Sequence, residues 1–127
     1  MLLSIIIPVY NEAPSIKILL ERIDRVMLPP GVAREVIVID DGSTDRTLEL
    51  IARRGSALTL LRNDRNRGKG YCVRRGLAAA RGDVALIQDG DLEYDPDDYV
   101  KLLAPILSGA ADVAYGSRFL KREGQQW

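Results

Sequence analysis

The sequence contains no histidine and only one cysteine, and both absences narrow the chemistry open to it. Without histidine, the chain itself has no Ser-His-Asp triad, no histidine general base and no histidine-ligated zinc. The single cysteine, Cys72, excludes an internal disulfide and a multi-cysteine zinc site, and fits a reducing compartment. We expect it to be a buried structural thiol. Any acid, base or metal chemistry must therefore use carboxylates.

Net charge and long apolar runs are also missing. Lys and Arg total 18, as do Asp and Glu, so no overall field attracts nucleic acid or an anionic membrane. The first apolar run breaks at Pro8, too early for a signal peptide or a membrane span. We therefore expect a soluble chain that binds no nucleic acid and whose affinity for phosphate is local. Its 127 residues, 46% of them hydrophobic, suffice for one domain with one core.

Short apolar runs alternate with amphipathic segments, a pattern typical of βαβ units with strands buried on both faces. The expected strands span residues 4–8, 35–39, 58–61, 84–88 and 113–115. The first expected helix spans residues 14–26, the second runs from an N-cap at Ser43 to Gly55, and the third spans residues 70–80. The fourth begins after an N-cap at Asp95 and is expected to bury Tyr99, Val100, Leu103 and Ile106. The predicted fold class is α/β, with a mostly parallel sheet and helices on both faces.

Acidic residues follow three of the expected strands, at the edge where open α/β sheets bind ligands. They are Glu12 after the first strand, Asp40, Asp41 and Asp45 after the second, and Asp89, Asp91 and Glu93 after the fourth. Asp89 and Asp91 can present two carboxylates to one Mg²⁺ or Mn²⁺, which relieves their repulsion. Mg²⁺ completes such a shell with substrate phosphates, so the ligand would be a diphosphate. A solvated turn is the competing interpretation of the Asp-x-Asp triplet.

Two further segments have structural interpretations. Residues 43–45, Ser-Thr-Asp, suit a turn and helix N-cap, whereas the roles of Asp40 and Asp41 stay open. Residues 66–70 resemble an anion-binding loop before a helix N-terminus and equally suit a solvated turn. This loop matches neither the P-loop nor the dinucleotide-binding fingerprint.

Five blocks of the sequence together resemble family 2 glycosyltransferases of the GT-A fold. The blocks span residues 4–12, 36–45, 66–70, 88–96 and 116–119. They are most similar to the branch of dolichyl- or polyprenyl-phosphate mannosyl- and glucosyltransferases. The resemblance implies a Rossmann-like fold for nucleotide-diphospho-sugar transferases. It also implies that residues 1–127 are one nucleotide-sugar-binding, N-terminal portion of a longer catalytic domain.

The resemblance also assigns roles to single residues. Pro8, Tyr10, Glu12, Asp40 and Asp41 are the candidates for the nucleotide pocket, and Lys69 would lie near the nucleotide. Asp89 and Asp91 would bind the metal, Asp89 shared with the ribose, with Glu93 as an additional ligand. Asp91 and Arg118 are the candidate catalytic residues, Arg118 approaching the diphosphate or an acceptor phosphate. The alternatives are a core-edge aromatic for Tyr10, a helix-dipole carboxylate for Glu12 and a surface ion pair for Arg118.

The implied reaction transfers a sugar, with inversion, from a UDP- or GDP-linked donor to an acceptor. Polyprenyl phosphate is one candidate acceptor. The chain would then act in the cytoplasm, with peripheral contact to the cytoplasmic face of a membrane as an open alternative. We expect this portion alone to bind a nucleoside diphosphate with metal and to transfer poorly. A non-catalytic nucleotide-binding fragment, a nucleotidyltransferase and a signalling receiver domain are the competing classes. Base, sugar, acceptor and oligomeric state stay open.

Overall fold

A computed structural model describes residues 1–54, 58–91, 95–107, 113–115 and 118–120, with only the backbone described for residue 102 and from residue 105 onward. In chain order the elements are β1 (Leu2–Val9), α1 (Ile16–Arg25), β2 (Ala33–Asp40), α2 (Thr47–Ala52), β3 (Thr59–Arg62), α3 (Lys69–Ala79), β4 (Val84–Ile87), η2 (Pro96–Asp98), α4 (Tyr99–Leu107), β5 (Val113–Tyr115) and β6 (Arg118–Leu120). All the expected strands and helices are present, and the short strand β6 is an addition to them.

The strands form one sheet in the order β3-β2-β1-β4-β5-β6. Strands β1 to β5 pair in parallel, and β6 pairs antiparallel with β5. The chain first builds outward from β1 through β2 to β3, and then crosses back to place β4 on the other side of β1. The order of the strands therefore reverses between β1 and β4, and in open α/β sheets such a switch point leaves a crevice for ligands.

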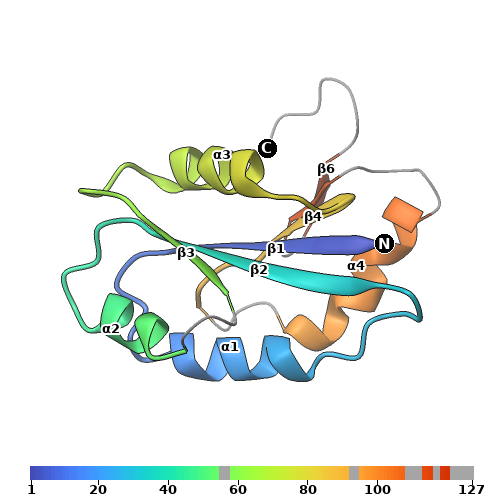
Figure 1. The fold of residues 1–127 in the computed structure, drawn as a ribbon, viewed down its shortest axis with the longest axis horizontal. Coiled ribbons are helices and arrows are strands. Elements are labelled where there is room, and N and C mark those ends of the chain that lie inside the picture. The colour runs from blue at the N-terminus through green and yellow to red at the C-terminus, as the bar shows by residue number, and fades with distance from the viewer. Residues whose placement is uncertain (55–57, 92–94, 108–112, 116–117, 121–127) are drawn as a thin grey trace.

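Helices cover both faces of the sheet (Figure 1). Helix α3 lies on one face, where Cys72 and Val73 join a core with Ile6, Ile37, Ile39 and Ile87. The helices α1, α2 and α4 lie on the other face. The residues buried there include Leu3, Ile5, Ile7, Leu19, Ile23, Ile51, Tyr99 and Leu103. Burial on both faces explains the three consecutive isoleucines of β1, Ile5, Ile6 and Ile7, because neither side of a central strand meets water.

Two local expectations are wrong. The second helix begins at Thr47 rather than after an N-cap at Ser43, whose hydroxyl instead accepts a hydrogen bond from the Asn11 amide at 2.9 Å. In α4, Val100 is 48% exposed, whereas Tyr99 and Leu103 are buried. Tyr99 and Leu103 are four residues apart and share one face of the helix, and Val100 is turned about 100° away. The N-cap at Asp95 is confirmed, since its carboxylate accepts a hydrogen bond from the Asp97 amide at 3.0 Å.

No helix in the described ranges is both long and apolar enough to cross a membrane.

Candidate functional site

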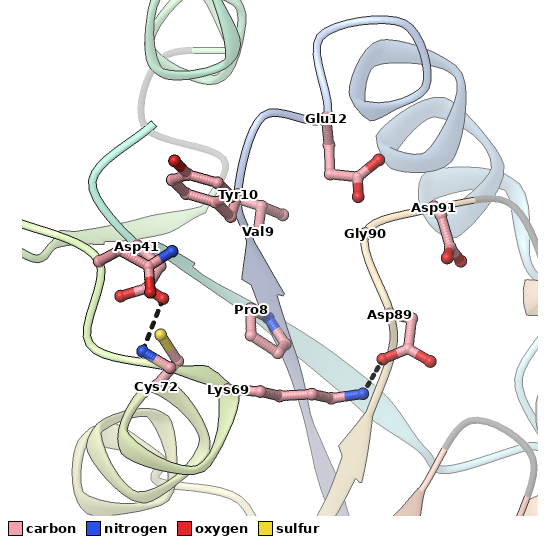
Figure 2. Close-up of a pocket in the computed structure, with 12 residues that line it drawn as sticks. Pro8, Val9, Tyr10, Glu12, Asp41, Lys69, Cys72, Asp89, Gly90 and Asp91 are labelled. Atoms are coloured by element: carbon pink, nitrogen blue, oxygen red, sulfur yellow. Dashed lines mark hydrogen bonds and ion pairs between the residues drawn. The ribbon is translucent and has the colours of Figure 1, made fainter. Parts of the chain in front are cut away.

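A pocket of about 340 Å³ opens at the carboxyl ends of the strands, beside the switch point between β1 and β4. Its lining residues come from four stretches of chain (Figure 2). They are Pro8, Val9, Tyr10 and Glu12 after β1, Asp41 after β2, Asn66, Gly68, Lys69 and Cys72 around the start of α3, and Asp89, Gly90 and Asp91 after β4. The acidic turns therefore meet at one edge of the sheet, because β1, β2 and β4 are parallel neighbours.

Most of the candidate site residues named from the sequence line this one pocket. They are Pro8, Tyr10, Glu12, Asp41, Lys69, Asp89 and Asp91. Figure 2 shows Tyr10 and Asp41 on one side, and Glu12, Asp89 and Asp91 on the other. Glu93 and the side chain of Arg118 lie outside the described residues, so their predicted roles stay predictions.

Asp40 is the exception among the described candidates. It is 0% exposed and is not part of the pocket lining. Successive residues of an extended segment point to opposite sides, so Asp40 points away from the pocket that Asp41 lines. Its Oδ2 accepts a hydrogen bond from the Ser43 amide at 3.3 Å, and its Oδ1 has no partner among the described residues. The structure does not bring Asp40 to the position that a nucleotide contact requires.

Asp41 holds the loop before α3 in place. Its Oδ1 accepts from the Arg67 amide at 2.7 Å and from Asn63 Nδ2 at 2.8 Å, and its Oδ2 accepts from the Gly68 amide at 2.9 Å. Burial raises the pKa of Asp41, but these hydrogen bonds outweigh it and hold the pKa below the usual 3.8. Asp41 is therefore ionised at neutral pH and only 4% exposed. Most of its acceptor capacity serves the protein itself.

Asn63 and Cys72 complete this buried network, and no local sequence pattern indicates the role of Asn63. Asn63 Nδ2 also donates to Cys72 Sγ at 3.3 Å, and Asn63 Oδ1 accepts from Arg75 at 2.8 Å. Burial, followed by the negative charge of Asp41, raises the pKa of Cys72 to about 12. The expected buried structural thiol is confirmed, because Cys72 is 0% exposed and stays protonated at neutral pH.

The other side of the pocket concentrates negative charge. Burial raises the pKa of Glu12 above 4.5, a hydrogen bond from Ser15 opposes this, and the charges of Asp91, Asp45 and Asp89 add to the increase. Ser15 Oγ lies 3.0 Å from Glu12 Oε2 and 3.0 Å from the Gly90 carbonyl oxygen, which ties the loop after β1 to the loop after β4. These neighbouring carboxylates repel one another when ionised, so a cation bound among them would be stabilised.

The donor set fits a divalent ion only in part. Within the described ranges, no group of three or more acidic or cysteine side chains is placed to hold a metal by itself. Asp89 and Asp91 nevertheless border the same pocket as two carboxylates. Mg²⁺ commonly binds through one or two carboxylates and takes its other ligands from water and substrate phosphates. The site thus suits an ion that arrives with a phosphorylated ligand.

Lys69 spans the pocket from the first residue of α3, and its ammonium pairs with the Asp89 carboxylate (Figure 2). The preceding Gly68 has a φ of 94°, a backbone conformation that favours glycine. The first turn of α3 carries no acidic residue. The amide dipoles at this helix start therefore favour an anion at the pocket rim.

Gly90 is closely packed against the chain that leaves β1. Here a Cβ on residue 90 would lie 2.8 Å from Val9 Cγ1 and 3.1 Å from Glu12 Cγ. In this chain an alanine at position 90 would push on Val9 and Glu12, two residues of the pocket lining.

A sheet with this strand order and an acidic pocket at its switch point places the chain in the Rossmann-like class of α/β domains. The family model described as glycosyl transferase family 2 matches residues 4–126, and the chain belongs to that family. This confirms the resemblance noted from the sequence blocks. It also argues against the receiver-domain and nucleotidyltransferase interpretations.

Curated relatives include glycosyltransferases named for polyprenyl-phosphate substrates. The chain is 37% identical over 123 residues to a dolichol-phosphate mannosyltransferase from Pyrococcus furiosus, covering 95% of this chain and 34% of the relative. It is 36% identical over 130 residues to an undecaprenyl-phosphate 4-deoxy-4-formamido-L-arabinose transferase from Pseudomonas aeruginosa, covering 99% of this chain and 38% of the relative. The chain therefore spans little more than a third of the length of these relatives.

Solved structures confirm the GT-A-like fold. A mannosyltransferase from Pyrobaculum calidifontis, solved with GDP-Man and Mn²⁺, has a TM-score of 0.69 and 34% identity, covering 80% of this chain and 32% of that one. The glucosyl-3-phosphoglycerate synthase of Mycobacterium tuberculosis, solved with Mn²⁺, UDP and phosphoglyceric acid, has a TM-score of 0.69 and 30% identity, covering 84% of this chain and 39% of that one.

Proposed function

We propose that this chain is the donor-binding portion of a glycosyltransferase that takes a sugar from a nucleoside diphosphate and passes it to polyprenyl phosphate. The observation that carries the proposal is that one pocket joins Tyr10 and Asp41 to Asp89 and Asp91 at the switch point of the sheet. The named substrates of the Pyrococcus and Pseudomonas relatives support the lipid phosphate as acceptor. The GDP-Man and UDP of the two solved structures support the nucleotide-linked donor.

The two sides of the pocket suit the two ends of such a donor. The ring of Tyr10, a residue that is 43% exposed, offers a face on which a base can stack. Asp41 lies next to it and can still accept a hydrogen bond from base or ribose. The diphosphate would lie toward Lys69 and the amide dipoles at the start of α3.

Asp89 and Asp91 would hold Mg²⁺ or Mn²⁺, and Glu93 is the further ligand that the resemblance implies. When bound, the ion would neutralise charge on the departing diphosphate. Mn²⁺ in both solved neighbours supports this assignment. Glu12, next to these carboxylates, adds negative charge that a cation would offset.

The chemistry is a displacement at the anomeric carbon of the sugar. A phosphate oxygen of the acceptor forms the new C–O bond as the bond to the nucleoside diphosphate breaks, and the diphosphate departs with the electron pair. Attack from the opposite face inverts the anomeric centre. Because the acceptor phosphate is already anionic near neutral pH, no general base is required. Arg118 would orient the acceptor or the diphosphate through its planar guanidinium.

Isothermal titration calorimetry with UDP and GDP, with and without Mg²⁺ or Mn²⁺, tests the donor site. We expect metal to increase the affinity for the nucleotide. We expect Asp91→Asn to reduce this metal-dependent increase at least tenfold, which corresponds to about 1.4 kcal/mol. Asp97→Asn is the matched control, because Asp97 is exposed and lies outside the pocket lining. If neither nucleotide binds under any condition, the proposal is wrong.

Transfer is expected to be weak for this chain alone, since it spans only about a third of the relatives' length. A radiolabelled donor and a short polyprenyl phosphate measure it directly. Efficient transfer by the 127-residue chain would contradict the assignment of residues 1–127 as a donor-binding portion only.

A further inference from the structure

Two loops that carry pocket residues are joined by a set of hydrogen bonds outside the pocket. Residues 11–13, after β1, bond to residues 43–47, which run from the loop after β2 to the first residue of α2, and we call this set the clasp. Asn11 N donates to Ser43 Oγ at 2.9 Å, Glu12 N to Thr47 Oγ1 at 2.8 Å and Ala13 N to Asp45 Oδ2 at 3.3 Å. Three consecutive amides of one loop are thus satisfied by side chains of the other.

Asn11 is the residue that makes the clasp reciprocal. Its Oδ1 accepts from the amides of Thr44 at 2.8 Å and Asp45 at 3.3 Å, so bonds run in both directions between the loops. Its φ of 52° makes it the only described non-glycine residue with a left-handed backbone. Asparagine tolerates this conformation better than most residues, because its short polar side chain bonds locally.

The clasp lies directly beside the pocket residues. Tyr10 and Glu12, on either side of Asn11, line the pocket, while Asn11 itself does not. The left-handed turn at Asn11 decides how the chain leaves β1 and therefore where Tyr10 and Glu12 point. The loop that Asn11 binds begins just after Asp41, which lies beside Tyr10 on the same side of the pocket (Figure 2).

We infer that Asn11 is a positioning residue for nucleotide binding, acting through the clasp and without touching the ligand; this rests on the proposed function. Without the side-chain oxygen of Asn11, the loop after β1 would sample conformations in which Tyr10 and Glu12 leave the pocket. The measured affinity falls by the fraction of molecules that hold the binding conformation.

Asn11→Gly isolates the side chain, because glycine adopts the same positive φ at no steric cost. We expect the affinity for UDP or GDP with Mn²⁺ to fall on the order of tenfold, the effect of losing about two hydrogen bonds. Asn11→Asp keeps an acceptor oxygen and should lose less. Ile23→Val, on the buried face of α1, is the matched control: it should lower the Tm without changing the dissociation constant.

Amide hydrogen exchange measures the clasp without any ligand. In Asn11→Gly we expect the amides of Thr44 and Asp45, and also those of Glu12 and Ala13, to lose protection while β1 keeps it. Unchanged exchange at all four amides overturns the clasp. Lost protection with unchanged nucleotide affinity overturns the positioning role. If the wild-type chain binds no nucleotide, the proposed function and with it the positioning role are wrong, and the exchange data alone decide whether the clasp exists.

Discussion

Gly42 lies where two loops of the pocket touch, directly after Asp41. Its φ is 75°, and a Cβ there would come within 2.6 Å of the Arg65 carbonyl carbon and 2.8 Å of the Asn66 amide nitrogen. These are backbone atoms, which cannot rotate away as the end of a flexible side chain can. Glycine is required here both by the backbone conformation and by the close approach of the loop that Asp41 binds.

Gly42→Ala is expected to destabilise the chain by about 1–3 kcal/mol, from overpacking added to left-handed strain. Nucleotide binding should weaken as well, because the displaced loop carries Gly68 and Lys69. Gly31→Ala is the matched control: Gly31 has a φ of 80° with nothing within 4 Å of its Cβ position. Urea unfolding compares the two variants, and equal losses would mean that contact with the loop contributes nothing.

Single residues also show what sequence could predict about the site. Asp41, Asp89 and Asp91 were identifiable because carboxylates directly follow apolar strands, and parallel pairing brings such positions together. Asn63 and Ser15 were not, because each contributes through bonds to residues that are distant in the sequence, such as Asp41 and the Gly90 carbonyl. Their side chains fit ordinary loop chemistry equally well, so no local pattern distinguishes them.

At the scale of elements, α3 brings a lysine ammonium to Asp89, a carboxylate that would also bind the metal. The ammonium of Lys69, the first residue of α3, pairs with Asp89. A divalent ion at Asp89 must compete with this ammonium, whereas a bound diphosphate would attract it. Removing the charge of Lys69 should therefore change the two affinities in opposite directions.

Lys69→Met is expected to tighten Mn²⁺ binding without nucleotide by up to about fivefold, in keeping with a partly exposed ion pair. The same change should weaken UDP or GDP binding in the presence of Mn²⁺. Electron paramagnetic resonance of free Mn²⁺ gives the first affinity and calorimetry the second. Lys101→Met, on an 84% exposed side chain of α4, is the control. Weaker metal binding in both states would show that Lys69 does not compete with the ion.

The elements themselves followed from periodicity, and the errors came from contacts between them. Ser43 has the chemistry of an N-cap, but the amide of Asn11 from another loop takes its hydroxyl, and α2 begins later, at Thr47. Val100 fits an apolar stripe by sequence, yet the burial of Tyr99 sets the phase of α4. The OH of Tyr99 donates to Gln88 Oε1 at 2.8 Å, a contact that no local pattern indicates.

For the whole molecule, the lowered pKa of Asp41 links stability to pH. A carboxyl group whose pKa is lower in the folded chain contributes its full stabilisation above the unfolded value, near 3.8, and loses it as the pH falls through the folded value. We expect Asp41→Asn to be less stable than wild type at pH 7, with the difference narrowing as the pH drops below about 4. Urea unfolding from pH 7 to pH 3 measures it. The free energy of unfolding of Asp97→Asn should follow that of wild type across this pH range. If the difference in unfolding free energy between wild type and Asp41→Asn does not change with pH, Asp41 does not link stability to pH.

The strand order has an evolutionary consequence. Residues before β4 build the Tyr10 and Asp41 side of the pocket. Asp89 and Asp91, which follow β4, build the other side together with Glu12 from the loop after β1 (Figure 2). Under the proposed function, selection could change the residues that contact the donor's base while Asp89 and Asp91 stay the same. If the proposed function is correct, a chimaera that exchanges the segments 41–47 and 63–68 with those of a relative of different base preference should inherit that preference and bind Mn²⁺ as the wild-type chain does.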